Sequence, residues 1–167
     1  MSTKHPRDDH WDRYSMIRNA KSLHRVVKEL ERHESESCTS DPLLFQGSGL
    51  AGSILLSLAT EIALKAWQCR ERKDAPDRTH DLLRLFKGLE PETQELLQAM
   101  MPGWPGIPEV SPFNHGSLAE LLWSHRDSYT HWRYLHEKHS AVFRTSELSQ
   151  ALTMILNAYG KRWGEFA

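Results

Sequence analysis

Residues 121–137 contain the side chains best suited to chemistry. This segment holds four aromatic residues, three histidines, two arginines and two acids, although it otherwise has the pattern of a helix. Arg126 and His131 stand five residues apart within it, and Asp127 directly follows the arginine. A guanidinium binds phosphate, and an imidazole exchanges protons near neutral pH. Repeated across a symmetric dimer, this pair would make a site for cleaving a phosphodiester bond.

The spacing of these three residues leaves two interpretations open. Arg126 and His131 lie about 140° apart around an ideal helix, so they would act together only in a distorted helix or across two chains. Asp127 and His131 are four residues apart, so they can touch directly, orient the ring and favour its protonated form. From residue chemistry alone, a satisfied surface pair is as good an interpretation as a catalytic one.

Basic residues gather toward the end of the most apolar predicted helix and in the turn behind it, at Lys65, Arg70, Arg72, Lys73 and Arg78. The ordinary interpretation is a solvated helix end, because cations favour the negative C-terminal end of the helix dipole. The formal net charge is −1, so any attraction for a nucleic acid must come from such local clustering. If the cluster lies beside Arg126, it would form a groove for an RNA backbone.

The sequence predicts neither a metal nor a cofactor. Cys38 and Cys69 are far apart and form no zinc-binding or disulfide pattern. His136 and His139 are three residues apart, which is not the spacing of a His-Glu-x-x-His zinc motif. Chemistry that depends only on side chains is therefore the expectation.

The elements that position these residues are all predicted to be helices. Apolar residues recur at intervals of three and four, and no stretch alternates with a period of two, so strands are not expected. Thr79 is the predicted N-cap of a short helix, and Ser117 with Glu120 forms a capping box before the segment described above. The predicted helices cover residues 10–34, 50–72, 80–89, 91–101, 118–138 and 146–163, with loops at 35–49 and 102–116.

The pattern predicts one all-α domain over residues 10–167, built from four to five main helices and shorter ones. The 167 residues suffice for one core. Residues 1–9 are polar, and we expect them to be disordered. No uninterrupted apolar run reaches about 18 residues, and the polar start lacks the pattern of a secretory signal. The expected location is therefore the cytoplasm, without a membrane.

Three passages resemble the HEPN superfamily, whose name refers to higher eukaryote and prokaryote nucleotide-binding domains. Residues 59–66, ATEIALKA, look like the central helix of bacterial HEPN proteins. Residues 79–86, THDLLRLF, are similar to their following short helix. Residues 126–137, RDSYTHWRYLHE, look like the terminal-helix motif, in which an arginine, a polar residue and about three variable residues precede a histidine. The likeness covers about residues 50–138 and keeps the family's order.

This resemblance implies an HEPN-like bundle and a metal-independent endoribonuclease, in which a 2′-hydroxyl attacks the adjacent phosphate. It also implies an antiparallel homodimer whose two motifs meet in one cleft. Arg126 would hold the phosphate, His131 would transfer the proton, and Asp127 would orient the histidine. Further RNA contacts are expected from Arg133, Lys65, Arg70, Arg72 and Lys73.

Such a protein would act as a toxin, or in stress or phage defence, with an antitoxin or a nucleotidyltransferase as a partner. Two alternatives stay open. One is a catalytically inactive HEPN module that binds RNA, a nucleotide or a protein. The other, less favoured, is a helical bundle that binds a small molecule and has no relation to RNA.

Overall fold

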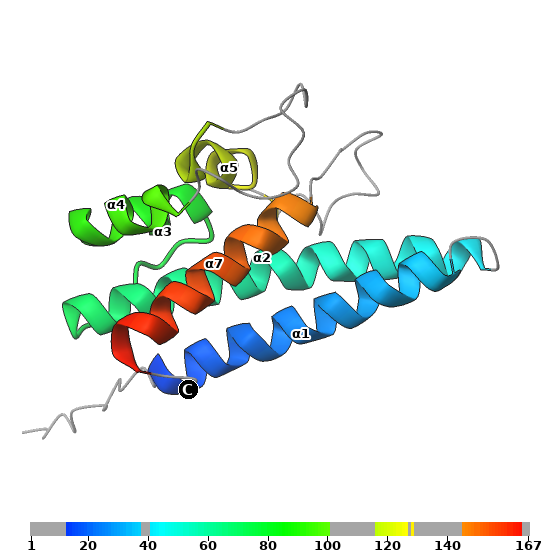
Figure 1. Ribbon diagram of the computed structural model, residues 1–167, viewed down its shortest axis with the longest axis horizontal. Helices are drawn as coiled ribbons and strands as arrows, with labels where there is room; N and C mark the ends of the chain where they lie inside the picture. Colours follow the sequence, from blue (N-terminus) through cyan, green and yellow to red (C-terminus); the bar gives the residue numbers. More distant parts are fainter. Residues whose placement is uncertain (1–12, 38–40, 101–115, 127, 129–144, 165–167) are drawn as a thin grey trace, which may run out of the picture.

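The computed structural model describes residues 13–37, 41–100, 116–126, 128 and 145–164. Within these ranges the chain is an all-α helical bundle without strands, as predicted (Figure 1). The bounds of its helices are α1 Arg13–Ser37, α2 Pro42–Arg72, α3 Leu82–Lys87, α4 Pro91–Ala99, α5 Leu118–Ser124 and α7 Thr145–Trp163. The predicted disordered segment, residues 1–9, lies outside the described residues.

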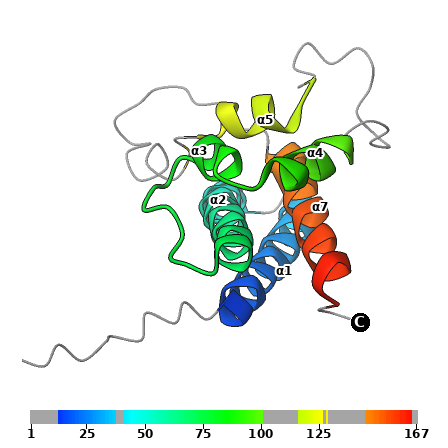
Figure 2. The ribbon, with the colours of Figure 1, turned by 90° about the vertical axis from the view of Figure 1, so that its left-hand side faces the viewer.

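The long helices α1, α2 and α7 form one layer, and the short helices α3, α4 and α5 form a second layer, called the cover (Figure 2). α1 and α2 run antiparallel along most of their lengths, and α7 packs against both (Figures 1 and 2). The short helices α3, α4 and α5 lie on the other side of α2 (Figure 2). α5 contacts α3, α4 and α7, so it is held by the cover as well as by the long layer.

α2 lies at the centre of the bundle and supplies most of the core. One buried cluster includes residues from all six described helices. Trp67 of α2 is fully buried, packs edge-on against Tyr159 with 5.5 Å between ring centroids, and donates from Nε1 to the Ile155 carbonyl at 3.3 Å. The stretch Phe45–Arg72 is long and apolar enough to span a membrane by length and composition, because it contains an 18-residue window with a mean hydropathy of 1.4. In the bundle 56% of that window is buried, in a helix that packs against both α1 and α7.

The start of α2 corrects the predicted loop over residues 35–49. α2 begins at Pro42, and α1 continues to Ser37. Asp41 caps α2, because its carboxylate accepts the backbone N–H of Leu43 at 3.1 Å and its carbonyl accepts that of Phe45 at 3.0 Å. Aspartate followed by proline is a helix-start signal, and packing along α1 outweighs the cost of the glycines that suggested a loop.

The start of α3 also differs from the prediction. Asp81, not Thr79, is the N-cap, and its carboxylate accepts the backbone N–H of Arg84 at 2.9 Å. The Thr79 hydroxyl accepts the N–H of Asp81 at 3.1 Å, so it orders the turn that precedes the helix. His80 therefore lies in this turn, and α3 begins two residues later, at Leu82.

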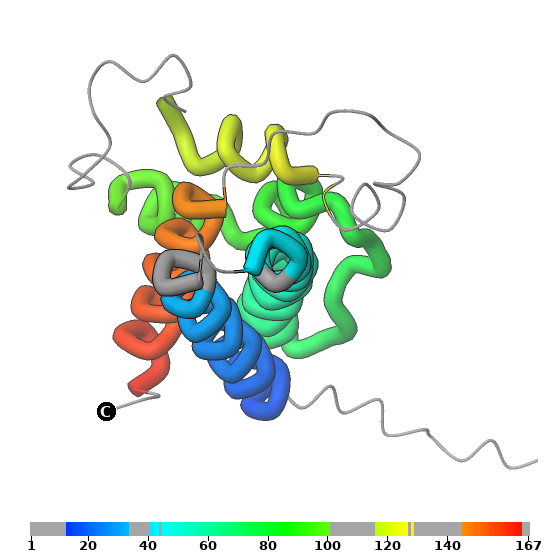
Figure 3. Tube along the Cα trace, turned by 90° about the vertical axis from the view of Figure 1, so that its right-hand side faces the viewer, coloured from blue at the N-terminus to red at the C-terminus, as the bar shows by residue number. Residues whose placement is uncertain are grey.

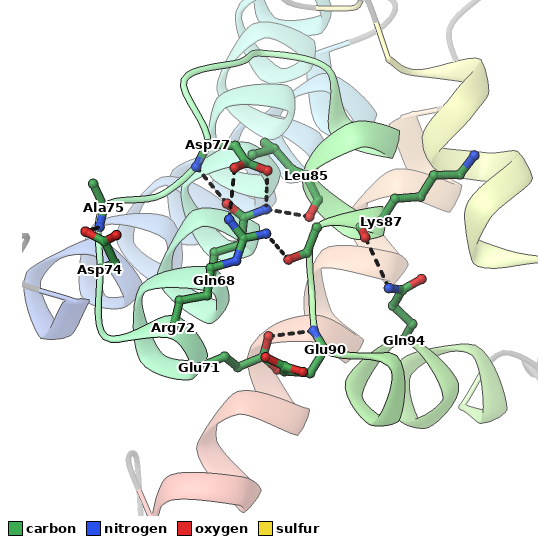
Figure 4. Close-up of polar contacts among 11 residues, drawn as sticks. Gln68, Glu71, Arg72, Asp74, Ala75, Asp77, Leu85, Lys87, Glu90 and Gln94 are labelled. Atoms are coloured by element: carbon green, nitrogen blue, oxygen red, sulfur yellow. Dashed lines mark hydrogen bonds and ion pairs between the residues drawn. The ribbon is translucent and has the colours of Figure 1, made fainter.

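A group of polar contacts, here called the α2–α3 latch, joins α2 to the segment before and after α3 (Figure 4). The Gln68 amide donates to the Leu85 carbonyl at 2.8 Å and to the Asp77 carboxylate at 3.1 Å, and it accepts the N–H of Asp77 at 2.9 Å. Arg72 pairs with Asp77 at 2.9 Å and donates to the Gly88 carbonyl. Gln68 is fully buried, so these partners satisfy an amide that has lost its water.

α4 begins at Pro91, as predicted, but its cap comes from α2. Glu90 makes no side-chain cap of its own, and the Glu71 carboxylate accepts the N–H of Glu90 at 2.9 Å (Figure 4). The same carboxylate accepts the hydroxyl of Thr93. At the other end of α4, the Gln98 side chain accepts the backbone N–H of Leu118, the first residue of α5, at 3.0 Å. Side chains thus connect α2 to α4 and α4 to α5.

Gly88 should not tolerate a side chain. A Cβ added there would lie 2.5 Å from Gln68 Nε2 and 2.7 Å from both Arg72 Nη2 and an Asp77 oxygen, all inside the latch. We expect Gly88→Ala to lower the free energy of unfolding by about 1–3 kcal/mol, measured by urea titration. Gly47→Ala is the control, because nothing lies within 4 Å of its added Cβ and the change should stabilise α2 by about 0.5–1 kcal/mol. Equal stability of Gly88→Ala and the wild type would contradict the role given to the latch.

Acidification should destabilise the bundle through His24. Burial between α1 and α7 lowers the pKa of His24 below its usual 6.5, and nearby Lys28 lowers this pKa further, whereas Glu31 raises it. Below pH 6.5 the His24 ring of the unfolded chain is protonated, whereas burial opposes protonation of the ring in the folded protein. The free energy of unfolding therefore falls as the pH is lowered, until the folded ring is protonated as well.

Urea titrations at pH 7.5 and 5.5 measure this loss. We expect His24→Gln to lose less stability over the interval than the wild type does. His33→Gln, at an exposed histidine of the same helix, should behave like the wild type. An unchanged pH dependence in His24→Gln would contradict the assignment.

Candidate functional site

Arg126 lies in a surface turn directly after α5. Its guanidinium sits over the ring of Trp123, 4.4 Å from the ring centroid. The Trp123 side chain is large and 55% exposed, so this stack faces solvent. A cation over an aromatic face is favourable, and Arg126 is therefore held beside an open apolar ring. Arg126 is the first residue of the predicted motif, and it is among the described residues.

The helix that precedes Arg126, α5, is shorter than the predicted one. The capping box opens α5, since the Ser117 hydroxyl accepts the N–H of Glu120 at 3.1 Å and the Glu120 carboxylate accepts that of Gly116 at 2.8 Å. α5 ends at Ser124, whose hydroxyl donates to the Leu121 carbonyl at 2.7 Å. Hydroxyl groups that bond to backbone in this way compete with the helix. A turn at residues 125–126 interrupts the helix predicted over 118–138, Ser128 is again helical, and residues 127 and 129–138 lie outside the described residues.

The turn after α5 changes the geometry expected for the motif. The N–H of Arg126 bonds to the Trp123 carbonyl at 3.2 Å, three residues back, as in a tightened last turn. The separation of about 140° from His131, which assumes an ideal helix, therefore does not apply. Asp127, His131 and Arg133 lie outside the described residues, so the structure places only the arginine of the motif.

His125 is a polar residue of this turn that the sequence analysis did not select. It is buried, with 4% of its surface exposed, and its Nδ1 lies 3.3 Å from the Ser128 hydroxyl. The N–H of Ser128 also bonds to the His125 carbonyl at 3.1 Å. These contacts join Ser128 to the turn that contains Arg126.

The predicted basic cluster on α2 divides between two sides of the helix. Lys65 pairs with Glu61 at 2.6 Å, and Arg72 belongs to the α2–α3 latch. Arg70 instead faces α7, where its guanidinium lies 5.5 Å from the Trp163 ring centroid. Lys73 follows the end of the helix with a left-handed backbone conformation (φ 56°) and is exposed. The four cations therefore do not share one face.

The surroundings of Arg70 are mixed in charge. It lines a hollow of 410 Å³ between α2, α4 and α7, together with Arg162 and three glutamates, Glu71, Glu90 and Glu92. Carboxylates repel a phosphate backbone, so the local field here opposes the binding of a polyanion. This hollow is a weaker place for RNA than the turn that holds Arg126.

Glu61, Lys65 and His80 form a second constellation, between α2 and the turn before α3. The Glu61 carboxylate is almost fully buried and contacts Lys65 Nζ at 2.6 Å and His80 Nδ1 at 3.0 Å. The His80 side chain is 62% exposed. Residues 59–66 and 79–86, two of the passages that resemble HEPN proteins, thus contact each other through Glu61 and His80, which are 19 positions apart in the chain.

This constellation has acid–base capacity. A carboxylate accepts hydrogen bonds, so Nδ1 of His80 is the donor and Nε2 of the neutral ring carries the lone pair. A carboxylate that orients an exposed imidazole in this way is a common arrangement for proton transfer. Sequence analysis interpreted His80 only as part of a helix start. The feature that could have predicted the Glu61–His80 contact was the presence of an acid, Glu61, inside the most apolar helix, because a buried charge requires a partner.

No group of three or more metal-binding side chains occurs in the described part of the chain. Comparison with protein-family models, with curated proteins and with solved structures finds no significant match.

Removing the Glu61 charge should loosen the contact between α2 and the turn before α3. We expect Glu61→Gln to lower the free energy of unfolding by about 1–3 kcal/mol, because the neutral amide still accepts a hydrogen bond from Lys65 but loses the charge that strengthens it. Glu95→Gln, at an exposed position of α4, is the matched control and should change stability little. Thermal and urea unfolding measure both. Equal effects of the two substitutions would show that Glu61 is not a structural anchor.

Proposed function

We propose that the protein is a metal-independent endoribonuclease of the HEPN type that acts as a homodimer. The observation that carries the proposal is the stack of Arg126 over Trp123, which is 55% exposed at the end of α5. A guanidinium binds phosphate oxygens, and an open aromatic ring stacks on bases. One surface turn thus offers both contacts that a single-stranded RNA needs.

In the proposed reaction, the 2′-hydroxyl of one nucleotide attacks the adjacent phosphorus. The O2′–P bond forms, the P–O5′ bond breaks, and a cyclic phosphate and a 5′-hydroxyl result. Arg126 neutralises the charge that grows on the non-bridging oxygens. Following the family resemblance, His131 takes or returns the proton and Asp127 orients its ring. Each motif of the homodimer faces the other in this proposal, so that one chain supplies the arginine and its partner the histidine.

The alternative is a catalytically inactive helical module that binds a protein or RNA. One observation favours it. Lys65 and Arg72, proposed RNA contacts, are already engaged with Glu61 and Asp77 inside the protein. In that case an antitoxin or a nucleotidyltransferase would be the partner protein.

Cleavage of labelled RNA by the purified protein tests the proposal. We expect cleavage to persist in EDTA and to fall by about 100-fold or more in Arg126→Ala and His131→Ala, because charge stabilisation and proton transfer each contribute that much. His33→Ala, at an exposed position of α1, is the matched control and should cleave like the wild type. Circular dichroism and the melting temperature verify that each variant is folded.

Three outcomes would contradict the assignment. Undiminished cleavage by His131→Ala would remove the proton-transfer role, and loss of activity in EDTA would remove the metal-independent mechanism. Loss of cleavage in His80→Ala, with full activity in His131→Ala, would move proton transfer to the Glu61–His80 pair. A folded wild-type protein that cleaves no RNA but binds a partner would favour the alternative.

A further inference from the structure

The outer face of α1 carries an unbalanced row of cations. Residues 13–28 contain five basic residues and no acid, whereas residues 29–37 contain four glutamates, Glu29, Glu31, Glu34 and Glu36. Among the described residues, Lys28 pairs with Glu31 at 2.9 Å and Arg32 with Glu29 at 3.0 Å. The basic residues of the first half of the helix are Arg13, Arg18, Lys21, Arg25 and Lys28.

Part of this row lines a hollow on the surface. Tyr14, Arg18, Lys21, Ser22 and Arg25 surround a hollow of 240 Å³ on α1, here called the α1 basic face. The Arg18 guanidinium lies 5.6 Å from the centroid of the Tyr14 ring. These residues are three or four positions apart in sequence, so they lie on one side of the helix. The core-facing side of the same helix is formed by Ile17, Ala20 and Val27, which are buried.

Helix stability does not explain this arrangement. The first turn of α1 has no acid and its last turn has no base. A helix dipole favours negative charge at the N-terminus and positive charge at the C-terminus, so the charges of α1 run against its own dipole. Within the described part of the chain, neither Arg18 nor Arg25 forms an ion pair with a carboxylate. The side chains of Arg18 and Arg25 are exposed to solvent.

We infer that the α1 basic face binds the phosphate backbone of a single-stranded polynucleotide. Guanidinium and ammonium groups contact successive phosphates, the Ser22 hydroxyl donates to a phosphate oxygen, and the Tyr14 ring, 52% exposed, stacks on a base. A membrane surface fits less well, because a helix that inserts into lipid needs a broad apolar face beside its cations. Here the large exposed hydrophobic side chains of α1 are Tyr14 and Val26 among the described residues.

This contact is separate from the turn that holds Arg126. α5 lies on one side of α2, and α1 on the opposite side (Figures 2 and 3). The α1 basic face would therefore add affinity for a long strand without touching the bond that is cleaved. The inference requires binding only, so it stands whether or not the protein cleaves RNA.

Fluorescence anisotropy with a labelled 2′-O-methyl RNA oligonucleotide tests it, because this probe lacks the attacking hydroxyl and stays intact. We expect the combined Arg18→Gln, Lys21→Gln and Arg25→Gln variant to bind at least about tenfold more weakly at low salt. The slope of log affinity against log salt, measured from about 50 to 200 mM, should fall by about 2, since each contact to a single strand contributes about 0.7.

The matched control removes the same number of charges elsewhere, by Arg84→Gln, Lys87→Gln and Lys161→Gln at exposed positions of α3 and α7. It should bind like the wild type. A second variant, Arg18→Lys with Lys21→Arg and Arg25→Lys, preserves the charge and should retain the salt slope. If the triple glutamine variant loses helical signal, the single changes Arg18→Gln and Arg25→Gln make the same test, each with a slope change of about 0.7.

Three results would overturn the inference. One is wild-type affinity and slope in the triple glutamine variant. Another is an equal loss in the control, which would show an effect of net charge alone. The third is sedimentation of the wild type with phosphatidylserine vesicles in the absence of any binding to the oligonucleotide. If the wild type binds the probe but cleaves no RNA, and the triple glutamine variant loses probe binding, the proposed nuclease is contradicted and this inference stands.

Discussion

The buried amide of Gln68 is the constraint on which the arrangement around α2 depends. Its exposure is zero, and both of its ends are bonded to the segment that includes Asp77 and Leu85. A buried amide left without partners costs about 1–3 kcal/mol, so the chain after α2 has one favourable path. That path fixes α3 against α2, and α3 in turn supports α5. The polar residues of the cover therefore owe their positions to a side chain that has no chemical role of its own.

The candidate sites differ in how far the fold determines them. Glu61 and His80 are held from two segments, one of them bound by the latch, so their mutual geometry is set by the core. Arg126 is set locally, by the tightened turn after α5 and by the ring of Trp123. A side chain on a surface turn can adjust to a ligand more readily than one anchored on a buried carboxylate. The Arg126 side chain can therefore adjust to a flexible ligand, whereas His80 is held in place by Glu61.

Sequence predicted those parts of the fold that local signals govern. Pro91 opens α4, the capping box opens α5, and α7 covers nearly the predicted range, because caps and apolar periodicity act over one or two turns. The errors fall where local signals compete. Glycines after Asp41 suggested a loop where α2 in fact begins, at Pro42. α5 was predicted to be longer, but it ends at Ser124, whose hydroxyl bonds to the backbone. The Glu61–His80 contact was not predicted, because no local pattern reports a pairing between residues 19 positions apart.

The cap that Glu71 supplies to α4 connects the last turn of α2 to the chain that leads to Arg126. α4 has no side-chain cap of its own, so the position of its first turn follows the last turn of α2. Its other end accepts the first N–H of α5 through Gln98, and α5 leads directly into the turn of Arg126. Because α4 and α5 also contribute buried residues to the core, a displacement of the C-terminal turn of α2 would be transmitted to the turn of Arg126 through both the caps and the core packing.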